Sequence, residues 1–219
     1  MKLMRAVLAF WAVTAVSLSA AEKDWQSLFD GKTLTGWTAV DGKPPGAGWK
    51  VVDGTIHLDG KGGNLITAEE YSSFELEWSW KIANKANNGI KYWVNDHGNK
   101  EWLGIEYQMI DDGVHHDGKI GSNRATASIY GIKAAAADKP LLPAEQWNQS
   151  RIVVKDGTIQ HYLNGKLVVE ADTKTEEWKK QVAASKFGKK QGFAPGRGRI
   201  MLTDHNDRTW FKDLRIRRL

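Results

Sequence analysis

The chain has 219 residues, a formal net charge of +5 and no cysteine. The lack of cysteine excludes disulfides, thiolate metal sites and a cysteine nucleophile. Lys2 and Arg5 carry two of the positive charges and leave +3 for the rest of the chain. Because this charge is mild and no basic stripe is interleaved with aromatic residues, we expect no nucleic-acid partner. The length suits one domain with a well-buried core.

The first 21 residues have the pattern of a secretory signal peptide. A charged start precedes the apolar run 6–18, and Ser19, Ala20 and Ala21 form a small-residue cleavage site. The run is short for a membrane span. We therefore predict a signal peptide over 1–21, one domain over 22–219, and no stable membrane insertion after cleavage. A domain of this size without cysteine suits a secreted or periplasmic bacterial protein.

The rest of the chain has the pattern of an all-β protein. In "SFELEWSWKI" (73–82) apolar and polar residues alternate, which predicts a half-buried antiparallel strand with Trp78 and Trp80 in the core. Hairpin turns are expected at Asp53-Gly54, Asp156-Gly157 and Asn164-Gly165.

One helix is predicted over 173–185, with Trp178 and Val182 on its buried face. The C-terminal "FKDLRIRRL" alternates like an edge strand with solvated arginines. Many short strands with turns between them predict a two-sheet jelly-roll sandwich with one short helix.

Two consecutive segments predict an unusual outward sheet face. In "NGIKYWVND" (88–96), alternation places Ile90, Tyr92 and Val94 in the core, and in "EWLGIEYQMI" (101–110) it does the same for Leu103, Ile105, Tyr107 and Met109. The other parity then carries Lys91, Trp93, Trp102, Glu106 and Gln108. Because indole rings stack on sugars and the remaining groups are polar, we interpret this face as the floor of a groove.

The loop "DDGVHHDGK" (111–119) gathers acids and histidines directly after this strand. Asp111, Asp112, His115, His116 and Asp117 offer ligands for a divalent cation such as calcium, manganese or zinc. Their spacing fits no dedicated calcium loop, and Asp-Asp-Gly is common turn chemistry, so a solvated turn is the competing interpretation.

Two further histidines belong to strand-like segments. His205 follows the odd-numbered positions opposite Ile200 and Leu202, so it could face the same groove. His161 shares the parity of Ile159 and Leu163, which favours a hydrogen-bonded, semi-buried side chain at least as much as a catalytic one.

Several segments, in order, resemble the 3-keto-disaccharide hydrolase family, which has a concanavalin-like jelly-roll fold. The matching segments are "SLFDGKTLTGW" (27–37), "NNGIKYWV" (87–94), "GIEYQMIDDGVHHDGK" (104–119), "QWNQSRIVVKDGTIQHYLNGK" (146–166), "ASK" (184–186) and "LTDHNDRTWFKDLRIRRL" (202–219). The chain departs from the family pattern at Thr203, where glutamine is usual, and at Asn206, where glycine is usual. "NNG" also replaces "NSG", and "HHDG" replaces "HPDA".

The resemblance implies an enzyme whose substrate is a 3-keto sugar, made by a separate dehydrogenase. The ketone acidifies the hydrogen on carbon 2, so a base can remove it and the aglycone can leave carbon 1, with net hydrolysis after water adds. The implied base is Glu106 or His115. The implied electrophile is Lys91, or a cation held by Asp111, His115 and Asp117.

The remaining site residues follow from the same resemblance. His205 is the candidate acid for the leaving oxygen. The candidates for binding the sugar are Gln108, Trp93, Trp102, Arg124 and Tyr130.

Two other functions compete with this one. A retaining glucanase would need paired carboxylates about 5 Å apart, and Glu106, Gln108 and Asp111 only partly match such a motif because Gln108 replaces the central acid. A non-catalytic carbohydrate-binding module fits the aromatic groove equally well, although simple sugar binding does not require so many ionisable groups.

Overall fold

A computed structural model describes residues 24–219. The predicted signal peptide lies outside the described residues. Within 24–219, no helix is long and apolar enough to cross a membrane.

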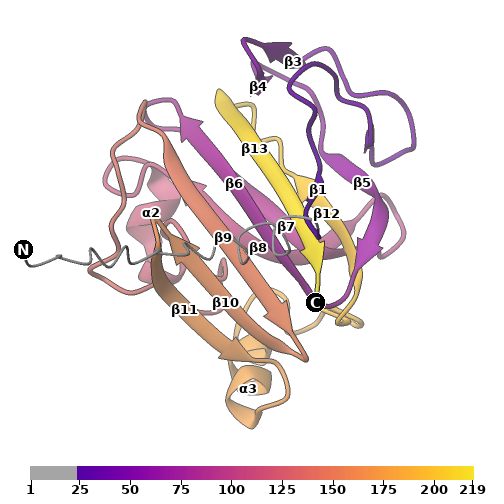
Figure 1. Cartoon of the computed structure of the whole chain (residues 1–219). Helices are drawn as coiled ribbons and strands as arrows, with labels where there is room; N and C mark the ends of the chain where they lie inside the picture. The colour runs from indigo at the N-terminus through magenta and orange to yellow at the C-terminus, as the bar shows by residue number, and fades with distance from the viewer. Residues whose placement is uncertain (1–23) are drawn as a thin grey trace, which may run out of the picture.

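The described chain folds into two antiparallel sheets that face each other (Figure 1). The eight-stranded sheet contains β1 (Gln26–Ser27), β3 (Trp49–Val52), β4 (Thr55–Leu58), β6 (Phe74–Ile82), β9 (Asn148–Lys155), β10 (Thr158–Leu163), β11 (Lys166–Asp172) and β13 (Thr209–Arg218). Its order is β11-β10-β9-β6-β13-β4-β3, with β1 paired to β13.

The five-stranded sheet contains β2 (Trp37–Ala39), β5 (Leu65–Tyr71), β7 (Asn87–Asp96), β8 (Trp102–Ile110) and β12 (Gly198–Leu202). Its order is β2-β5-β12-β7-β8, so β8 is an edge strand. The predicted all-β jelly-roll sandwich is confirmed.

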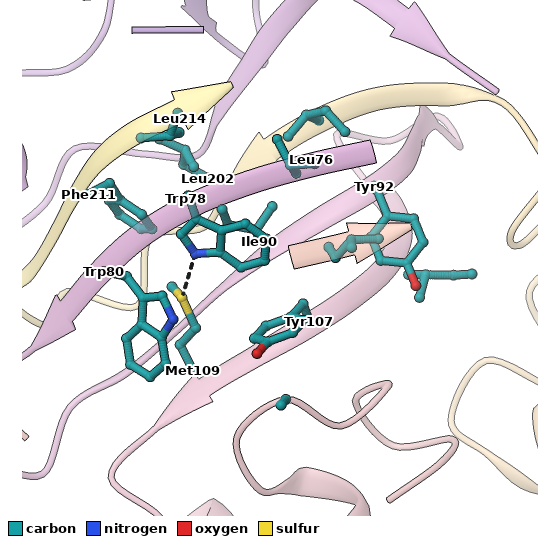
Figure 2. Packing of buried hydrophobic residues seen from close by; sticks show 14 of the residues in the cluster. Leu76, Trp78, Trp80, Ile90, Tyr92, Tyr107, Met109, Leu202, Phe211 and Leu214 are labelled. Carbon is teal, nitrogen blue, oxygen red and sulfur yellow. Dashed lines mark hydrogen bonds between the residues drawn. The ribbon is translucent and has the colours of Figure 1, made fainter. Parts of the chain in front are cut away.

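The core lies between the sheets and is rich in aromatic residues (Figure 2). On β6, the predicted inward set is buried: Phe74, Leu76, Trp78, Trp80 and Ile82. Trp78 donates through Nε1 to Sδ of Met109 (3.5 Å), and Trp80 donates to Oγ of Ser150 (2.8 Å). Large indole rings fill the space between the sheets, and each N–H finds a partner there. The prediction for Trp78 and Trp80 is confirmed.

The predicted hairpin turns are also confirmed. Asp53, Asp156 and Asn164 have φ of 48°, 49° and 46°, and each is followed by a glycine with positive φ. Two consecutive residues in the left-handed region match the right-handed twist of the paired strands, which is why Asp-Gly and Asn-Gly are favoured there.

The predicted helix is α3 (Glu176–Ala184), which begins after the N-cap Thr175 and buries Trp178. Thr175 accepts through its side chain from N of Trp178, as a capping threonine should. The acidic loop adds a five-residue helix, α2 (His116–Ile120), and the short 3-10 helix η1 (Ser122–Arg124), which the sequence pattern did not predict.

The edge-strand prediction for the C-terminus is wrong. β13 lies inside the eight-stranded sheet, between β6 and β4. Its arginines are paired rather than simply solvated: Arg215 and Arg217 contact Glu77 and Glu75 of β6. Alternation shows which face of a strand is exposed to solvent, but it does not show whether the strand pairs with one or two other strands.

Candidate active site

The centre of the candidate site is Glu106, on the outer face of the five-stranded sheet. The β7–β8 register sets Lys91 directly opposite Glu106. The ammonium Nζ lies 3.8 Å from Oε2 of the carboxylate. Glu106 is only 6 % exposed, yet it points away from the core between the sheets and toward Lys91. Glu106 therefore lies on the predicted side of the sheet, but the prediction that its side chain is exposed is wrong.

His205 reaches the same carboxylate from the segment after β12. Its Nε2 lies 3.9 Å from Oε1 of Glu106, and its side chain is 42 % exposed. Neighbouring residues hold this segment in place: Asp204 accepts from N of Gly62 and Gly63 (both 2.7 Å), and Thr203 donates to O of Gly89 (3.0 Å). His205 therefore reaches the sheet face that carries Glu106, as predicted.

Two of the four departures from the family pattern, Thr203 and Asn206, lie in this segment and fit its conformation. Thr203 uses its hydroxyl to bind the β7 backbone. Asn206 has a φ of 66°, in the left-handed region that asparagine tolerates better than most residues other than glycine.

A loop segment along the free edge of β8 forms the wall of the site. Tyr130 donates its backbone N–H to O of Glu106 (3.0 Å), and Ile129 bridges to Tyr107. The Tyr130 hydroxyl donates to Oδ2 of Asp117 (3.0 Å), and Arg124 lies 3.3 Å from Oδ1 of the same carboxylate. Two of the predicted sugar-binding residues, Tyr130 and Arg124, are therefore joined through Asp117, and Tyr130 adjoins the Glu106 strand.

Lys186 is a site residue that the sequence reasoning missed. It follows α3 and places its ammonium 4.4 Å from the centroid of the Tyr130 ring. Its charge acts on Glu106, together with those of Lys91 and His205. The signal that could have identified it was the "ASK" segment, which was noted only as part of the family resemblance.

The electrostatics favour an ionised Glu106. Burial raises the pKa of its carboxyl, but Lys91, His205 and Lys186 together outweigh this effect, so the net pKa lies below its ordinary value. Burial, with help from Asp117, raises the pKa of Tyr130 to about 12, so its hydroxyl stays protonated. Burial lowers the pKa of Lys186, while Glu106 opposes that shift.

The structure does not bring the acidic loop together as a metal site. Asp111 accepts from N of Lys85 (2.9 Å), and Asp112 binds N of Thr126 (2.6 Å) and Lys139 (2.8 Å). Across 24–219, no three metal-ligating side chains of His, Cys, Asp and Glu converge. The contacts of Asp111 and Asp117 give no support to their metal-binding prediction, because these carboxylates already accept from a backbone N–H group, a tyrosine and an arginine.

His115 has a structural position in this loop. It is the N-cap of α2 and accepts through Nδ1 from N of Asp117 (3.1 Å). In the described chain the imidazole within ion-pair reach of Glu106 is that of His205. The contacts therefore give His115 the role of placing Asp117, and give no support to its prediction as the base.

Trp93 is not a groove residue, so its predicted role in sugar binding is wrong. A bulge shifts the β7–β8 register between Tyr92 and Asn95, and Trp93 has a φ of 52°. The extra residue reverses the parity of the strand. Trp93 therefore enters the core and donates to O of Ser72 (2.9 Å), whereas Val94 turns to the outer face.

Trp102 and Gln108 do lie on the predicted face, with different surroundings. Trp102 is half-buried and packs on Ile66, Val94 and Met201, which makes one end of the face apolar. Gln108 is 1 % exposed, and neither of its amide atoms has a partner. A side chain so covered does not touch a bound sugar in this conformation, which corrects its predicted role.

His161 is buried, and it supports the wall of the site from within the core. Its Nδ1 lies 2.9 Å from O of Ala127, and its Nε2 lies 3.0 Å from the hydroxyl of Tyr92. Since a carbonyl only accepts, Nδ1 carries the proton and Nε2 accepts from Tyr92. The prediction of a hydrogen-bonded core histidine is confirmed, with deeper burial than expected.

A separate groove of about 940 Å³ lies on the eight-stranded sheet, on the opposite side of the sandwich. Trp25, Arg151, Tyr162 and Arg215 line it, and it contains none of the predicted site residues. Its two guanidinium groups are already paired with glutamates of β6. We therefore place the chemistry at Glu106, where charged groups converge.

A family model and a curated relative both relate this chain to enzymes that act on 3-keto sugars. Residues 24–217 match the family model described as a 3-keto-alpha-glucoside-1,2-lyase-like domain. A 3-keto-disaccharide hydrolase from Bacteroides thetaiotaomicron is 31% identical over an alignment of 244 positions, covering 92% of this chain and 84% of that protein.

Two solved structures from Parabacteroides distasonis ATCC 8503, both described as candidate glycosyl hydrolases, are also similar. One has a TM-score of 0.83 and 29% identity, covering 91% of this chain and 95% of the other. The second has a TM-score of 0.70 and 25% identity, covering 89% and 99%. The chain belongs to the 3-keto-alpha-glucoside-1,2-lyase-like family.

Proposed function

We propose that this glycoside-cleaving enzyme acts on glycosides whose sugar carries a ketone at carbon 3, and that it releases the aglycone by elimination followed by addition of water. One observation carries the proposal: a single buried carboxylate, Glu106, lies between Lys91 and His205 with further cations around it. Such an arrangement suits removal of one proton and stabilisation of the negative charge that results.

Each group has a distinct part in the proposed reaction. Glu106 removes the proton from carbon 2, and its lowered pKa keeps it ionised for that purpose. The cations nearby, Lys91 above all, stabilise negative charge that develops on the ketone oxygen. His205, which is partly exposed beside Glu106, protonates the leaving oxygen on carbon 1.

Tyr130 and Arg124, in the loop beyond β8, are suited to bind the sugar. Tyr130 lies beside the Glu106 strand, and Asp117 joins its hydroxyl to the guanidinium of Arg124. The Tyr130 oxygen, whose proton goes to Asp117, can accept from a sugar hydroxyl, and the guanidinium of Arg124 has further N–H groups that can donate to one.

Neither competing function is favoured by the arrangement. A retaining glucanase needs a second carboxyl beside Glu106, but Gln108 occupies the next outward position and Asp111 is bound to the backbone of Lys85. A simple carbohydrate-binding module needs no buried carboxylate flanked by an amine and an imidazole.

The residues present do not fit a resident metal ion. The loop carboxylates are committed to other donors, and Glu106 is flanked by an amine and an imidazole without a second carboxylate. The proposed reaction therefore uses no metal ion.

We also propose that the enzyme acts outside the bacterial cytoplasm after removal of residues 1–21. The charged start, the short apolar run and the small residues before position 22 support this location.

The test is to incubate the mature protein with a glucoside and with its 3-keto derivative, each with and without a chelator. Release of aglycone from the 3-keto compound alone is expected, and the chelator should not change it. Comparable cleavage of the plain glucoside would disprove the need for the ketone. Binding of either compound without cleavage would instead favour a carbohydrate-binding module.

A further inference from the structure

A row of charged and aromatic side chains crosses the outer face of the eight-stranded sheet, on the opposite side of the sandwich from the candidate active site. β13, β6 and β9 lie side by side there (Figure 1), and their register sets Arg215, Glu77 and Arg151 next to one another. The row continues to Tyr162 of β10 at one end, and β1, which follows Trp25, pairs with β13 at the other. Because neighbouring strands lie about 4.8 Å apart, the row spans roughly 19 Å.

This row forms the floor of the groove of about 940 Å³ on this sheet. Arg215 donates through Nε (2.9 Å) and Nη2 (2.7 Å) to Oε2 of Glu77. Arg151 donates to Oε1 of Glu75 (2.9 Å). Both guanidinium groups in the lining are therefore neutralised by a carboxylate of β6, and each keeps further N–H groups.

The remaining carboxylates of the lining also have donors of their own. Asp213 accepts from Oγ of Ser79 (3.0 Å), and Asp30 accepts from N of Lys32 (2.8 Å) and of Thr33 (2.7 Å). All five charged side chains that line the groove are thus already paired or hydrogen-bonded: Asp30, Glu77, Arg151, Asp213 and Arg215. The groove therefore offers many polar contacts with little net charge, which disfavours an ionic ligand.

An aromatic ring lies toward each end of the floor and is held in place by an arginine. The guanidinium of Arg151 is 3.9 Å from the centroid of the Tyr162 ring, and that of Arg215 is 4.5 Å from the Trp25 ring. Both rings are half-buried, so part of each is accessible from the groove. Rings that are fixed before a ligand arrives lower the entropy cost of binding it.

This combination has the chemistry of a surface for neutral sugars. A sugar hydroxyl both donates and accepts, so neighbouring hydroxyls match guanidinium N–H groups that alternate with carboxylate oxygens. The apolar C–H face of a pyranose packs against an indole or phenol ring. The length of the row suits several linked sugar units rather than one.

We propose that this groove binds a neutral oligosaccharide chain and so holds the enzyme on carbohydrate while the site at Glu106 does the chemistry. The two surfaces belong to different sheets, so both can be occupied at once. This inference does not rest on the proposed function, because binding in the groove needs neither a ketone nor Glu106.

The experiment is calorimetric titration of the mature protein with neutral and acidic sugars. Maltohexaose and cellohexaose are the neutral probes, hexagalacturonate is an acidic chain of the same length, and glucose is a single unit. We expect at least one of the neutral chains to bind, and both hexagalacturonate and glucose to bind roughly tenfold more weakly or not at all.

Three variants place the binding in the groove. Trp25→Ala removes one ring and should weaken binding roughly tenfold. Gln149→Trp changes an exposed lining residue of β9, fills the groove and should abolish binding. Trp147→Ala removes a half-buried indole outside the groove and is the matched control, so it should bind normally. Trp25→Ala and Gln149→Trp should release aglycone from a small 3-keto glucoside at the wild-type rate, with thermal unfolding unchanged.

Several results would overturn the inference. These are no binding of either neutral chain, tighter binding of hexagalacturonate, or wild-type binding by both Trp25→Ala and Gln149→Trp. Self-association in sedimentation that Gln149→Trp abolishes would show that a second copy of the chain occupies the groove instead. If a neutral chain binds and Gln149→Trp abolishes this binding, while the wild type releases nothing from the 3-keto glucoside, the groove assignment stands and the proposed function fails.

Discussion

Gly89 and Glu106 fit against each other across the β7–β8 pair: a Cβ added at Gly89 would lie 2.5 Å from Oε1 of Glu106. The missing side chain is therefore what admits the carboxylate beside Lys91. Gly89 keeps an extended backbone without positive φ, so its importance lies in space rather than in conformation.

Gly89→Ala should displace the Glu106 carboxylate while leaving the sheet folded. A shift of about 1 Å in a reacting group costs roughly a hundredfold in rate, so we expect a loss of that order in kcat on a 3-keto glucoside. Steady-state kinetics with circular dichroism would measure it. Full activity in Gly89→Ala would mean that the carboxylate position is not critical.

Glu106→Gln should keep the shape of the side chain and remove the base. We expect turnover to fall by roughly two to four orders of magnitude, with little change in thermal unfolding. His116→Ala, an exposed position on α2, serves as the control and should be nearly neutral. Equal activity of Glu106→Gln and wild type would place the base elsewhere.

Lys91→Met should change the pH dependence of the reaction in a defined direction. Lys91 helps to hold the pKa of Glu106 below its ordinary value, so removing it should move the acidic limb of kcat/KM to higher pH. The charged form of Glu106 likewise contributes stability that is present above its unfolded pKa and lost as pH falls through the folded value. An unmoved limb would show that this carboxyl does not control the rate.

Two variants of His115 can show whether this residue caps α2 or takes part in catalysis. His115→Ala removes the acceptor for N of Asp117 and should loosen α2, with loss of activity through Tyr130 and Arg124. His115→Asn keeps an N-cap acceptor and should restore most of that activity. Kinetics of the two variants decide the role, since a catalytic histidine would not be replaced by asparagine.

His161 should make folding stability depend on pH. Burial lowers the pKa of its imidazole to about 4, so the neutral form is favoured in the folded state. The unfolded chain binds the proton more readily, so this contribution is fully present above about pH 6.5 and is lost as pH falls toward 4.

The size of that loss is roughly 2–4 kcal/mol for a shift of this size. Urea unfolding of wild type and His161→Gln at pH 7 and pH 4.5 would measure it, with a smaller difference between the two pH values expected in the variant. An equal pH difference in both proteins would show that other groups cause it.

The alternation of apolar and polar residues correctly predicted which sheet face a side chain occupies wherever the strand is regular. Trp78, Trp80, Lys91 and Glu106 all lie on the predicted faces. Trp93 does not, because one bulged residue reverses the parity, and nothing in "NGIKYWVND" marks the bulge.

Local sequence patterns could not predict contacts between segments that lie far apart in the chain. Lys186 follows a helix, and its contact with Tyr130 depends on how that helix packs against the sandwich. Asp117 could have bound a cation or an arginine, and only the folded loop shows that Arg124 and Tyr130 take its two oxygens. The position of β13 inside the sheet was hidden for the same reason.

That position has a consequence for folding. β6 pairs with β13, which lies far along the chain, and Phe74 is matched with Arg218. Until β13 takes its place the eight-stranded sheet is divided, with β6 on one side of the gap and β4 on the other. Contacts so far apart in sequence form slowly, so pairing of β13 with β6 should be a late step in folding.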